Sequence, residues 1–144
     1  MTVNLVKLCV GVETPSVLGE FIARRIKAAK DSGIAPRVSH ITRMSPKRRD
    51  ELLNGGSLYW VMKGSIQARQ LLIDVVDFTD DEGVKRCELV LKPELVLTAV
   101  QPRKAFQGWR YLPVEDAPSD LSQSVVTDKI DPKMLSELSE LGLL

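Results

Sequence analysis

Residues 57–77 read SLYWVMKGSIQARQLLIDVVD, the longest apolar and β-prone stretch in a chain of 144 residues. Apolar and mixed positions alternate over 58–63, as in a strand that buries one face. Gly64 indicates a turn, after which residues 66–78 continue as a long second strand whose pattern changes midway. Such a change suits a strand that bends around a barrel corner. The stretch therefore predicts the central β-hairpin of a small sheet or barrel.

Two strands and two helices are predicted ahead of this hairpin. Residues 4–12 indicate a strand, and Thr14 followed by a proline starts a helix whose apolar stripe continues to about residue 32. A strand of mixed polarity is expected over 37–44, and a second cap-and-proline pair indicates a short helix over 45–54. The opposite face of the first helix is interpreted as solvated, because it is basic: Arg24, Arg25, Lys27 and Lys30.

After the hairpin, an acidic turn at 80–83 leads into strands over 84–91 and 94–100. Strands at short intervals favour an antiparallel or mixed sheet over alternating βαβ units. A last amphipathic helix is expected over 131–142. The predicted fold class is α+β: a small mixed or antiparallel β-barrel or curved sheet with two N-terminal helices and one C-terminal helix.

Charge is unevenly distributed along the chain. Residues 1–113 hold 18 basic and 12 acidic side chains, a net of +6, whereas residues 114–144 hold 2 and 7, a net of −5. A basic body with an acidic tail is typical of nucleic-acid binders, and a solvated helix on a linker is the plainer alternative. We expect one domain over 1–144, made of a basic α+β core, an acidic linker over 114–130 and the C-terminal helix.

Composition places the chain among proteins of the cytoplasm. No segment approaches 18 consecutive apolar residues, and the first residues lack the pattern of a secretory signal, so we expect no membrane association. Cys9 and Cys87 fall within expected strands, which favours buried thiols over a disulfide.

Motifs for catalysis, metals and cofactors are weak. The only histidine, His40, has no metal-ligand spacing to either cysteine, and a Cys–His pair would form only if the fold brought them together. The acidic residues around 74–82 are interpreted as solvated or turn residues. Nucleotide-binding and nucleophile-elbow motifs are absent from the sequence. We therefore predict no catalytic residues, no metal and no cofactor, and favour a binding module over an enzyme.

The helix expected over 45–54 starts with cations where acids are favoured. Its first turn holds Lys47, Arg48 and Arg49, although the positive end of the helix dipole disfavours them. Locally unfavourable choices are expected at functional sites, and cations beside a helix N-terminus strengthen a phosphate site. The alternative is that the side chains extend into water. Arg43 is a candidate fourth member of this group.

Residues 103–112 (RKAFQGWRYL) combine cations with aromatic rings. Unpaired bases stack on such rings while cations meet the phosphates, so Trp109 or Tyr111 would stack and Arg103 would contact phosphate. On a strand, Arg110 would face away from both rings; the alternative is that the rings only close the barrel. The predicted nucleic-acid or anion-binding residues are Arg43, Lys47, Arg48, Arg49, Lys63, Arg69, Gln70, Arg103, Trp109, Arg110 and Tyr111.

Three segments carry a family resemblance: 59–64 (YWVMKG), 68–70 (ARQ) and 105–112 (AFQGWRYL). With them the chain resembles a small uncharacterised bacterial domain-of-unknown-function family, which implies no catalytic residues because that family has no assigned activity. The order of elements is also similar to the PUA-like superfamily, which includes the ASCH and EVE domains. That resemblance implies a small β-barrel with flanking helices and binding of RNA or modified bases. The short Gly-Lys-Glu-Arg-type motif of ASCH domains is absent.

Three functions follow. The leading prediction is a module that binds RNA or single-stranded nucleic acid, with Arg69 and Arg110 adding polar recognition. The second is a small enzyme or binder that takes an anionic small molecule in a pocket over the barrel, using these arginines and a carboxylate such as Asp74. The third is a protein-interaction domain that forms a homo-oligomer through the C-terminal helix.

Overall fold

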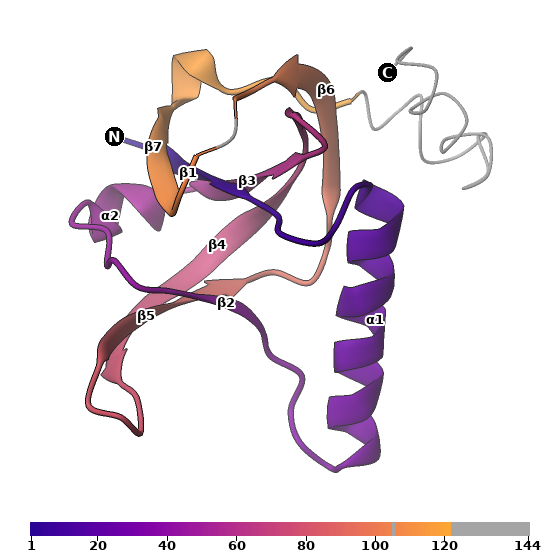
Figure 1. The fold of residues 1–144 in the computed structure, drawn as a ribbon, viewed down its shortest axis with the longest axis vertical. Coiled ribbons are helices and arrows are strands. Elements are labelled where there is room, and N and C mark those ends of the chain that lie inside the picture. The colour runs from indigo at the N-terminus through magenta and orange to yellow at the C-terminus, as the bar shows by residue number, and fades with distance from the viewer. Residues whose placement is uncertain (105, 122–144) are drawn as a thin grey trace.

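A computed structural model describes residues 1–104 and 106–121 of the chain (Figure 1). Its elements are β1 (Val3–Leu8), α1 (Pro15–Asp31), β2 (Val38–Thr42), α2 (Arg49–Leu52), β3 (Ser57–Met62), β4 (Ser65–Thr79), β5 (Lys85–Leu91), β6 (Val96–Pro102), β7 (Trp109–Pro113) and the 3₁₀ turn η1 (Val114–Asp116). Within the described ranges, no helix is long and apolar enough to cross a membrane.

The seven strands form one mixed sheet around the long strand β4. The order is β2-β5-β4-β3-β1-β7, and β6 pairs with β4 outside this path. β1 and β3 are parallel, and the other pairs are antiparallel. β6 pairs with residues 65–69 of β4 and β5 with residues 72–79, so the two strands follow one another along β4. The predicted central hairpin is confirmed as β3 and β4.

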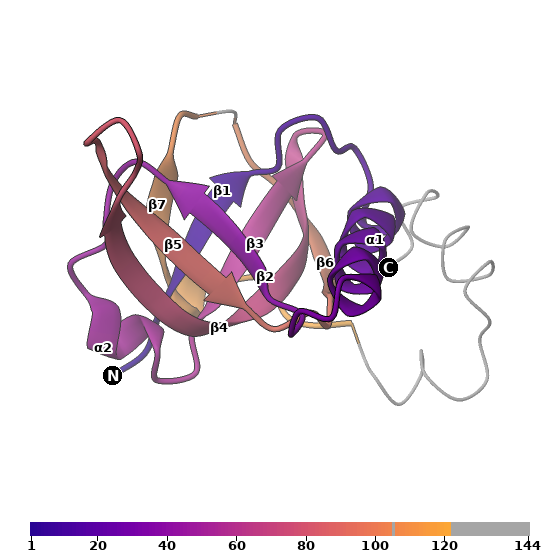
Figure 2. The same ribbon diagram turned by 90° about the horizontal axis from the view of Figure 1, so that it is seen from below.

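The predicted fold class is wrong, because the sheet curls without closing into a barrel and the described residues hold less helix than predicted. β2 and β7 end the strand order, and no strand pairing joins them in the described chain. Side chains bridge these edges instead: Trp109 Nε1 donates to Met44 O at 2.8 Å, and the Tyr111 hydroxyl accepts from Lys47 N at 2.8 Å. Figure 2 shows the curl of the sheet and α1 along one side of it.

Helices contribute less than predicted. Of the expected two N-terminal helices and one C-terminal helix, the described residues contain α1 and the single turn α2. The helix expected over 131–142 lies outside the described residues. The described part of the chain is therefore mostly sheet, because five strands, β3 to β7, follow one another between residues 57 and 113.

α1 forms where the sequence predicts it. The Thr14 hydroxyl accepts from Val17 N at 3.3 Å, which caps one free N–H of the first turn. Gly33 follows the helix with φ of +72°, a conformation that ends helices and favours glycine. Ile22 is buried, and Leu18 and Ile26 pack against the core. Burial of one such side chain stabilises the fold by about 1.5–3 kcal/mol.

α2 is much shorter than the helix predicted over 45–54. It begins at Arg49, with Arg48 as its N-cap residue, and contains four residues. Ser45 does not cap it, because the Ser45 hydroxyl donates to the carboxylate of Asp77 on β4. Lys47 therefore lies in a loop, and the argument that cations occupy the first turn of a longer helix is wrong.

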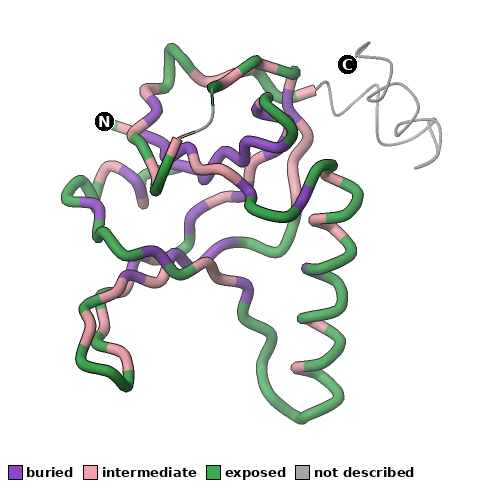
Figure 3. Tube along the Cα trace, in the orientation of Figure 1, coloured by how far each residue is buried: buried purple, intermediate pink, exposed green. Residues whose placement is uncertain are grey.

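Two hydrophobic clusters cover the two faces of β3. The larger includes Leu58 and Trp60, whereas the smaller includes Tyr59 and Val61 and has Phe106 packed against it. All six residues of β3 are buried, as Figure 3 shows along that strand. Apolar residues occupy both faces of β3 because a hydrophobic cluster packs against each face.

Candidate functional site: a pocket between α1 and the sheet

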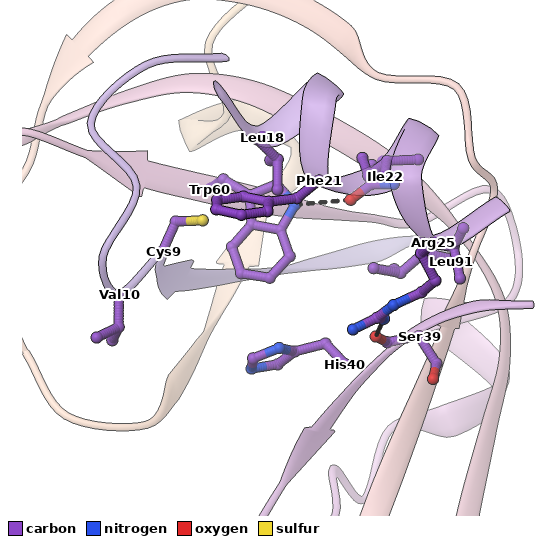
Figure 4. A pocket seen from close by; sticks show the side chains of 12 residues that line it. Cys9, Val10, Leu18, Phe21, Ile22, Arg25, Ser39, His40, Trp60 and Leu91 are labelled. Carbon is purple, nitrogen blue, oxygen red and sulfur yellow. Dashed lines mark hydrogen bonds between the residues drawn. The ribbon is translucent and has the colours of Figure 1, made fainter. Parts of the chain in front are cut away.

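A pocket of about 200 Å³ lies between α1 and the sheet (Figure 4). Four strands, the segment after β1 and one face of the helix contribute to its wall. The lining residues are Cys9, Val10, Leu18, Phe21, Ile22, Arg25, Val38, Ser39, His40, Trp60, Gln70 and Leu91. The wall is mainly apolar, and its polar groups come from α1, β2 and β4.

Trp60 forms a rigid part of this wall. Its side chain is buried, and its Nε1 donates to Gln70 Oε1 at 2.9 Å. Gln70 Nε2 in turn donates to Lys92 O at 2.8 Å, so both ends of the amide are used. Gln70, a predicted binding residue, is only 1% exposed and holds the indole in place.

His40 on β2 faces the same indole. The two ring centroids are 5.2 Å apart with an interplanar angle of 89°, an edge-to-face contact. His40 Nε2 is buried and has no hydrogen-bond partner among the described residues. Burial, followed by the charges of Lys7 and Arg25, lowers the pKa of His40 from 6.5 to about 4. The imidazole is therefore neutral at pH 7, and its buried Nε2 is free to bond a ligand.

Two cations converge on this imidazole. Arg25 extends from α1 toward β2 and donates from Nη1 to Ser39 O at 2.9 Å (Figure 4). Lys7 on β1 is directly opposite Trp60 and also opposite Trp109, and directly opposed residues share one face of a sheet. Neither Lys7 nor Arg25 forms a salt bridge with a carboxylate in the described part of the chain.

Cys9 lines the pocket with His40, so the fold does bring a cysteine and the histidine to one site. Burial raises the pKa of the Cys9 thiol to about 11, and the nearby charge of Lys7 only partly opposes this. A nucleophilic cysteine acts as the thiolate. A neutral thiol beside a neutral imidazole does not form an activated pair. Both cysteines are buried and free, as predicted. No cluster of three metal-ligating side chains occurs within residues 1–104 and 106–121.

Several predicted binding residues meet at the junction of β7 with the loop before α2, which we call the β7 seam. The Tyr111 hydroxyl accepts from the backbone N–H groups of Lys47 and Arg48, and the Arg48 guanidinium lies 5.2 Å from the centre of its ring. The Trp109 and Tyr111 rings contact each other edge to face at 4.9 Å. Arg48 also forms a bidentate ion pair with Glu51. The aromatic residues of the seam thus join two edges of the sheet, and exposed Arg43 precedes them.

The fold does not bring together the arginines and the carboxylate that the sequence predicted to bind an anionic small molecule. Arg69 forms a bidentate ion pair with Asp120, at 2.8 and 2.6 Å, in a separate open cleft beside β3. Asp74 pairs instead with Arg49 at 2.6 Å. Arg110 lies 5.4 Å from the centre of the Phe106 ring on the other face of β7. The arginines and the carboxylate of this prediction occupy three different places.

Lys63 and Arg103 are neighbours at the turn between β3 and β4. Lys63 has φ of +50°, and the following Gly64 accepts at its carbonyl from Arg103 N at 2.9 Å. Arg110 faces away from the seam rings, as predicted. Phe106, ahead of β7, packs against the smaller cluster, whereas Trp109 packs against the larger.

The pocket residues His40 and Arg25, and Lys7 of β1, were not among the predicted binding residues. Arg25 was interpreted as part of a solvated helix face, yet it lies next to the apolar stripe that includes Ile22. A lysine inside the apolar run 4–12 was a second signal. Neither signal specifies that Arg25 and Lys7 lie near the same imidazole, because the two cations belong to different elements.

Residues 5–144 match the family described as Protein of unknown function (DUF1489), and the chain belongs to this family. The match covers both the sheet and α1. Neither the curated proteins nor the solved structures gave a significant match. The expected uncharacterised family is therefore confirmed, and the comparisons do not extend it to the PUA-like superfamily.

Proposed function

We propose that this chain is a small-molecule binding module, and that the pocket between α1 and the sheet takes an anion with an apolar part. The observation that carries the proposal is the convergence of Arg25, Lys7 and His40 beside a pocket whose described lining contains no Asp or Glu. An unbalanced cation beside an apolar wall favours a ligand that supplies both a negative charge and an apolar surface.

The electrostatics support an anion of modest size. Arg25 has five N–H donors, and within the described chain one of its nitrogens is bonded, to Ser39 O. Charge-assisted bonds from a guanidinium to a carboxylate are stronger than neutral ones, and partial exclusion of water strengthens them further. Trp60 and Leu18 would cover the apolar part of the ligand.

The test is a titration of the whole chain with a panel of small carboxylates and phosphates, followed by two-dimensional NMR. We expect saturable shifts at residues of α1, β2 and β3. Arg25→Gln should weaken binding about tenfold, as expected for loss of a charged partner. Lys27→Gln is the matched control, since Lys27 is an exposed cation on α1 outside the pocket. Absence of saturable binding, or equal losses in the two variants, would contradict the proposal.

Binding of RNA or single-stranded nucleic acid is a second candidate. It is favoured by two arginine–aromatic pairs at β7, Arg48 over Tyr111 and Arg110 over Phe106. In this PUA-like proposal, Lys47, Arg48, Arg49 and Arg103 contact phosphates, Trp109 or Tyr111 stacks on a base, and Arg69 and Arg110 add polar recognition. Exposed Arg43 and Lys63 would extend the basic path.

Fluorescence anisotropy with single-stranded RNA tests this second candidate. We expect affinity to fall with salt at a logarithmic slope of about −0.7 per phosphate contact. Arg110→Gln should weaken binding, whereas Lys85→Gln, at the distant β4–β5 hairpin, should not. Salt-independent binding, or none, would remove the candidate. Self-association through residues 131–142 and a cytoplasmic location stay predictions.

A further inference from the structure

We infer that the ligand of the α1–sheet pocket is a carboxylate attached to a single planar ring. This inference rests on the proposed function and narrows it to one chemical class. Its carboxylate would bind Arg25, and its ring would lie against Trp60. The argument comes from the size of the pocket, the fixed orientation of its aromatic wall, and the placement of its charges.

Size limits the ligand first. The pocket has a volume of about 200 Å³. An apolar cavity of about 150 Å³ accommodates a benzene-sized ring. The remaining space suits one small polar group, so a single ring with a carboxylate fits. A complete nucleotide, with base, sugar and phosphate, is too large to be enclosed.

The wall favours a flat ring over a flexible chain. Trp60 cannot rotate freely, because its N–H is bonded to Gln70, which is itself bonded to Lys92 O. His40 already contacts this indole edge to face, and Phe21 of α1 lies across the pocket from β2 (Figure 4). Aromatic rings pack well in such offset or edge-on positions. A rigid aromatic wall loses little freedom when a ring binds.

The polar end matches a planar carboxylate. Among the cations, Arg25 lines the pocket directly, and its bond to Ser39 O orients the guanidinium. A guanidinium presents parallel N–H groups that pair with the two oxygens of a carboxylate. Lys7 adds positive charge from β1 without lining the pocket. One guanidinium with one nearby ammonium is suited to a singly charged group.

Binding should also draw a proton from solvent onto His40. The charged and titratable groups that face this imidazole are Lys7 of β1 and Arg25 of α1, with the neutral thiol of Cys9 in the same pocket. A bound carboxylate offsets the two cations and favours the imidazolium. The proton moves from water to the imidazole, and the ligand stays ionised. Affinity should therefore increase as the pH falls through the pKa of His40 in the complex toward its lower pKa in the free protein.

The experiment compares benzoate with benzamide, cyclohexanecarboxylate and phenyl phosphate on the full chain. Benzoate should bind best, and benzamide should bind about tenfold more weakly because it lacks the charge. Cyclohexanecarboxylate tests whether the ring must be planar, and phenyl phosphate tests whether the charged group must be a carboxylate. Arg25→Gln should abolish the preference for benzoate over benzamide, and Lys27→Gln should preserve it.

The proton is followed directly, because His40 is the only histidine in the chain. Its imidazole NMR signals should titrate near pH 4 in the free protein and at clearly higher pH with saturating benzoate. Benzoate affinity should rise several-fold between about pH 7.5 and about pH 5.5. This measurement uses the wild-type chain and does not depend on whether a His40 variant folds.

The outcomes separate the two proposals. Equal binding of cyclohexanecarboxylate and benzoate, tighter binding of phenyl phosphate, or an unchanged His40 titration would overturn the inference while the pocket proposal stands. Equal binding of benzamide and benzoate would overturn both, because the proposed function requires an anion. Failure of every compound to shift residues of α1 and β2 would overturn both. Preferential benzoate binding with an upward shift of the His40 titration supports both.

Discussion

The two tryptophans of this chain lie on the same face of the sheet but make different contacts. Trp60 on β3 is buried, and its N–H is bonded to the side chain of Gln70 within the same hairpin. Trp109 on β7 is half-buried, and its N–H is bonded to the backbone of Met44 across the edge of the sheet. Lys7 lies between them in register. One indole lines a pocket, and the other joins two edges.

This comparison shows how context decides the role of an aromatic residue. The motif around Trp109 is rich in cations and rings and therefore indicates binding, whereas the run around Trp60 indicates scaffold. In the fold, Trp109 and Tyr111 make the contacts of a seam, and the scaffold strand supplies a pocket wall. The polar groups of these two side chains are hydrogen-bonded to nearby backbone groups, so the rings stabilise the sheet. Any binding role would be in addition to that.

Replacement of Trp60 by alanine should cause the largest loss of stability and so separate the two tryptophans most clearly. Removal of a buried aromatic leaves a cavity, and we expect the free energy of unfolding to fall by about 3–5 kcal/mol. Trp109→Ala, on a half-buried ring, should lose clearly less. Urea denaturation of both variants measures the difference. Equal losses would show that the two indoles contribute alike and that the distinction is wrong.

Gln70→Leu should have the next largest effect. It leaves the Trp60 N–H and the Lys92 carbonyl without their partner, and a buried unsatisfied group costs about 1–3 kcal/mol. The indole should also lose its fixed orientation, which a change in tryptophan fluorescence would report. Gln67→Leu is a suitable control, because Gln67 is less buried and its side chain bonds Met62 O alone among the described residues. A stable Gln70→Leu with unchanged fluorescence contradicts the assigned role.

Stability should decrease on acidification because of His40. Its pKa is about 4 in the folded chain and near 6.5 when unfolded, so the unfolded chain binds more protons between these values. Stability is therefore complete above about pH 6.5 and is lost as the pH falls toward 4, by on the order of 1 kcal/mol at pH 5 after allowance for partial exposure. His40→Gln should flatten this part of the pH profile. The same slope in both proteins would contradict the assignment.

Tyr111→Phe should have the smallest effect. The hydroxyl accepts two backbone N–H groups of the loop before α2, but water can replace it at this partly exposed place. We expect a loss of about 0.5–1.5 kcal/mol in the free energy of unfolding. Hydrogen exchange should increase at Lys47 and Arg48 more than in α1. Unchanged exchange at both amides would show that the seam does not depend on this hydroxyl.

The local elements were predictable from short-range signals. Alternation and the turn at Gly64 predicted the β3–β4 hairpin, and a capping threonine with proline predicted α1. The same capping signal failed at Ser45, whose hydroxyl bonds Asp77 instead of the following helix. A cap signal describes what a side chain can do locally, and a tertiary partner can replace that role.

The candidate site was less predictable than the fold elements. Gln70 was among the predicted binding residues and does line the pocket, but Arg25, His40 and Lys7 were not. Arg49, Arg69 and Arg110 were expected to work near one ligand, and each has a different neighbour: Asp74, Asp120 and Phe106. Charge counts along a chain do not reveal which carboxylates the fold places beside each cation.

By itself, the sequence determined the period of each element, the position of most turns and the burial of both cysteines, because these depend on residues near one another in the chain. Only the tertiary structure decided the parallel pairing of β1 with β3, the bridging of β2 and β7 by rings, and the meeting of Arg25, His40 and Trp60. These contacts join residues far apart in the sequence. Their selection depends on how the whole sheet curls and buries its residues, which no local pattern encodes.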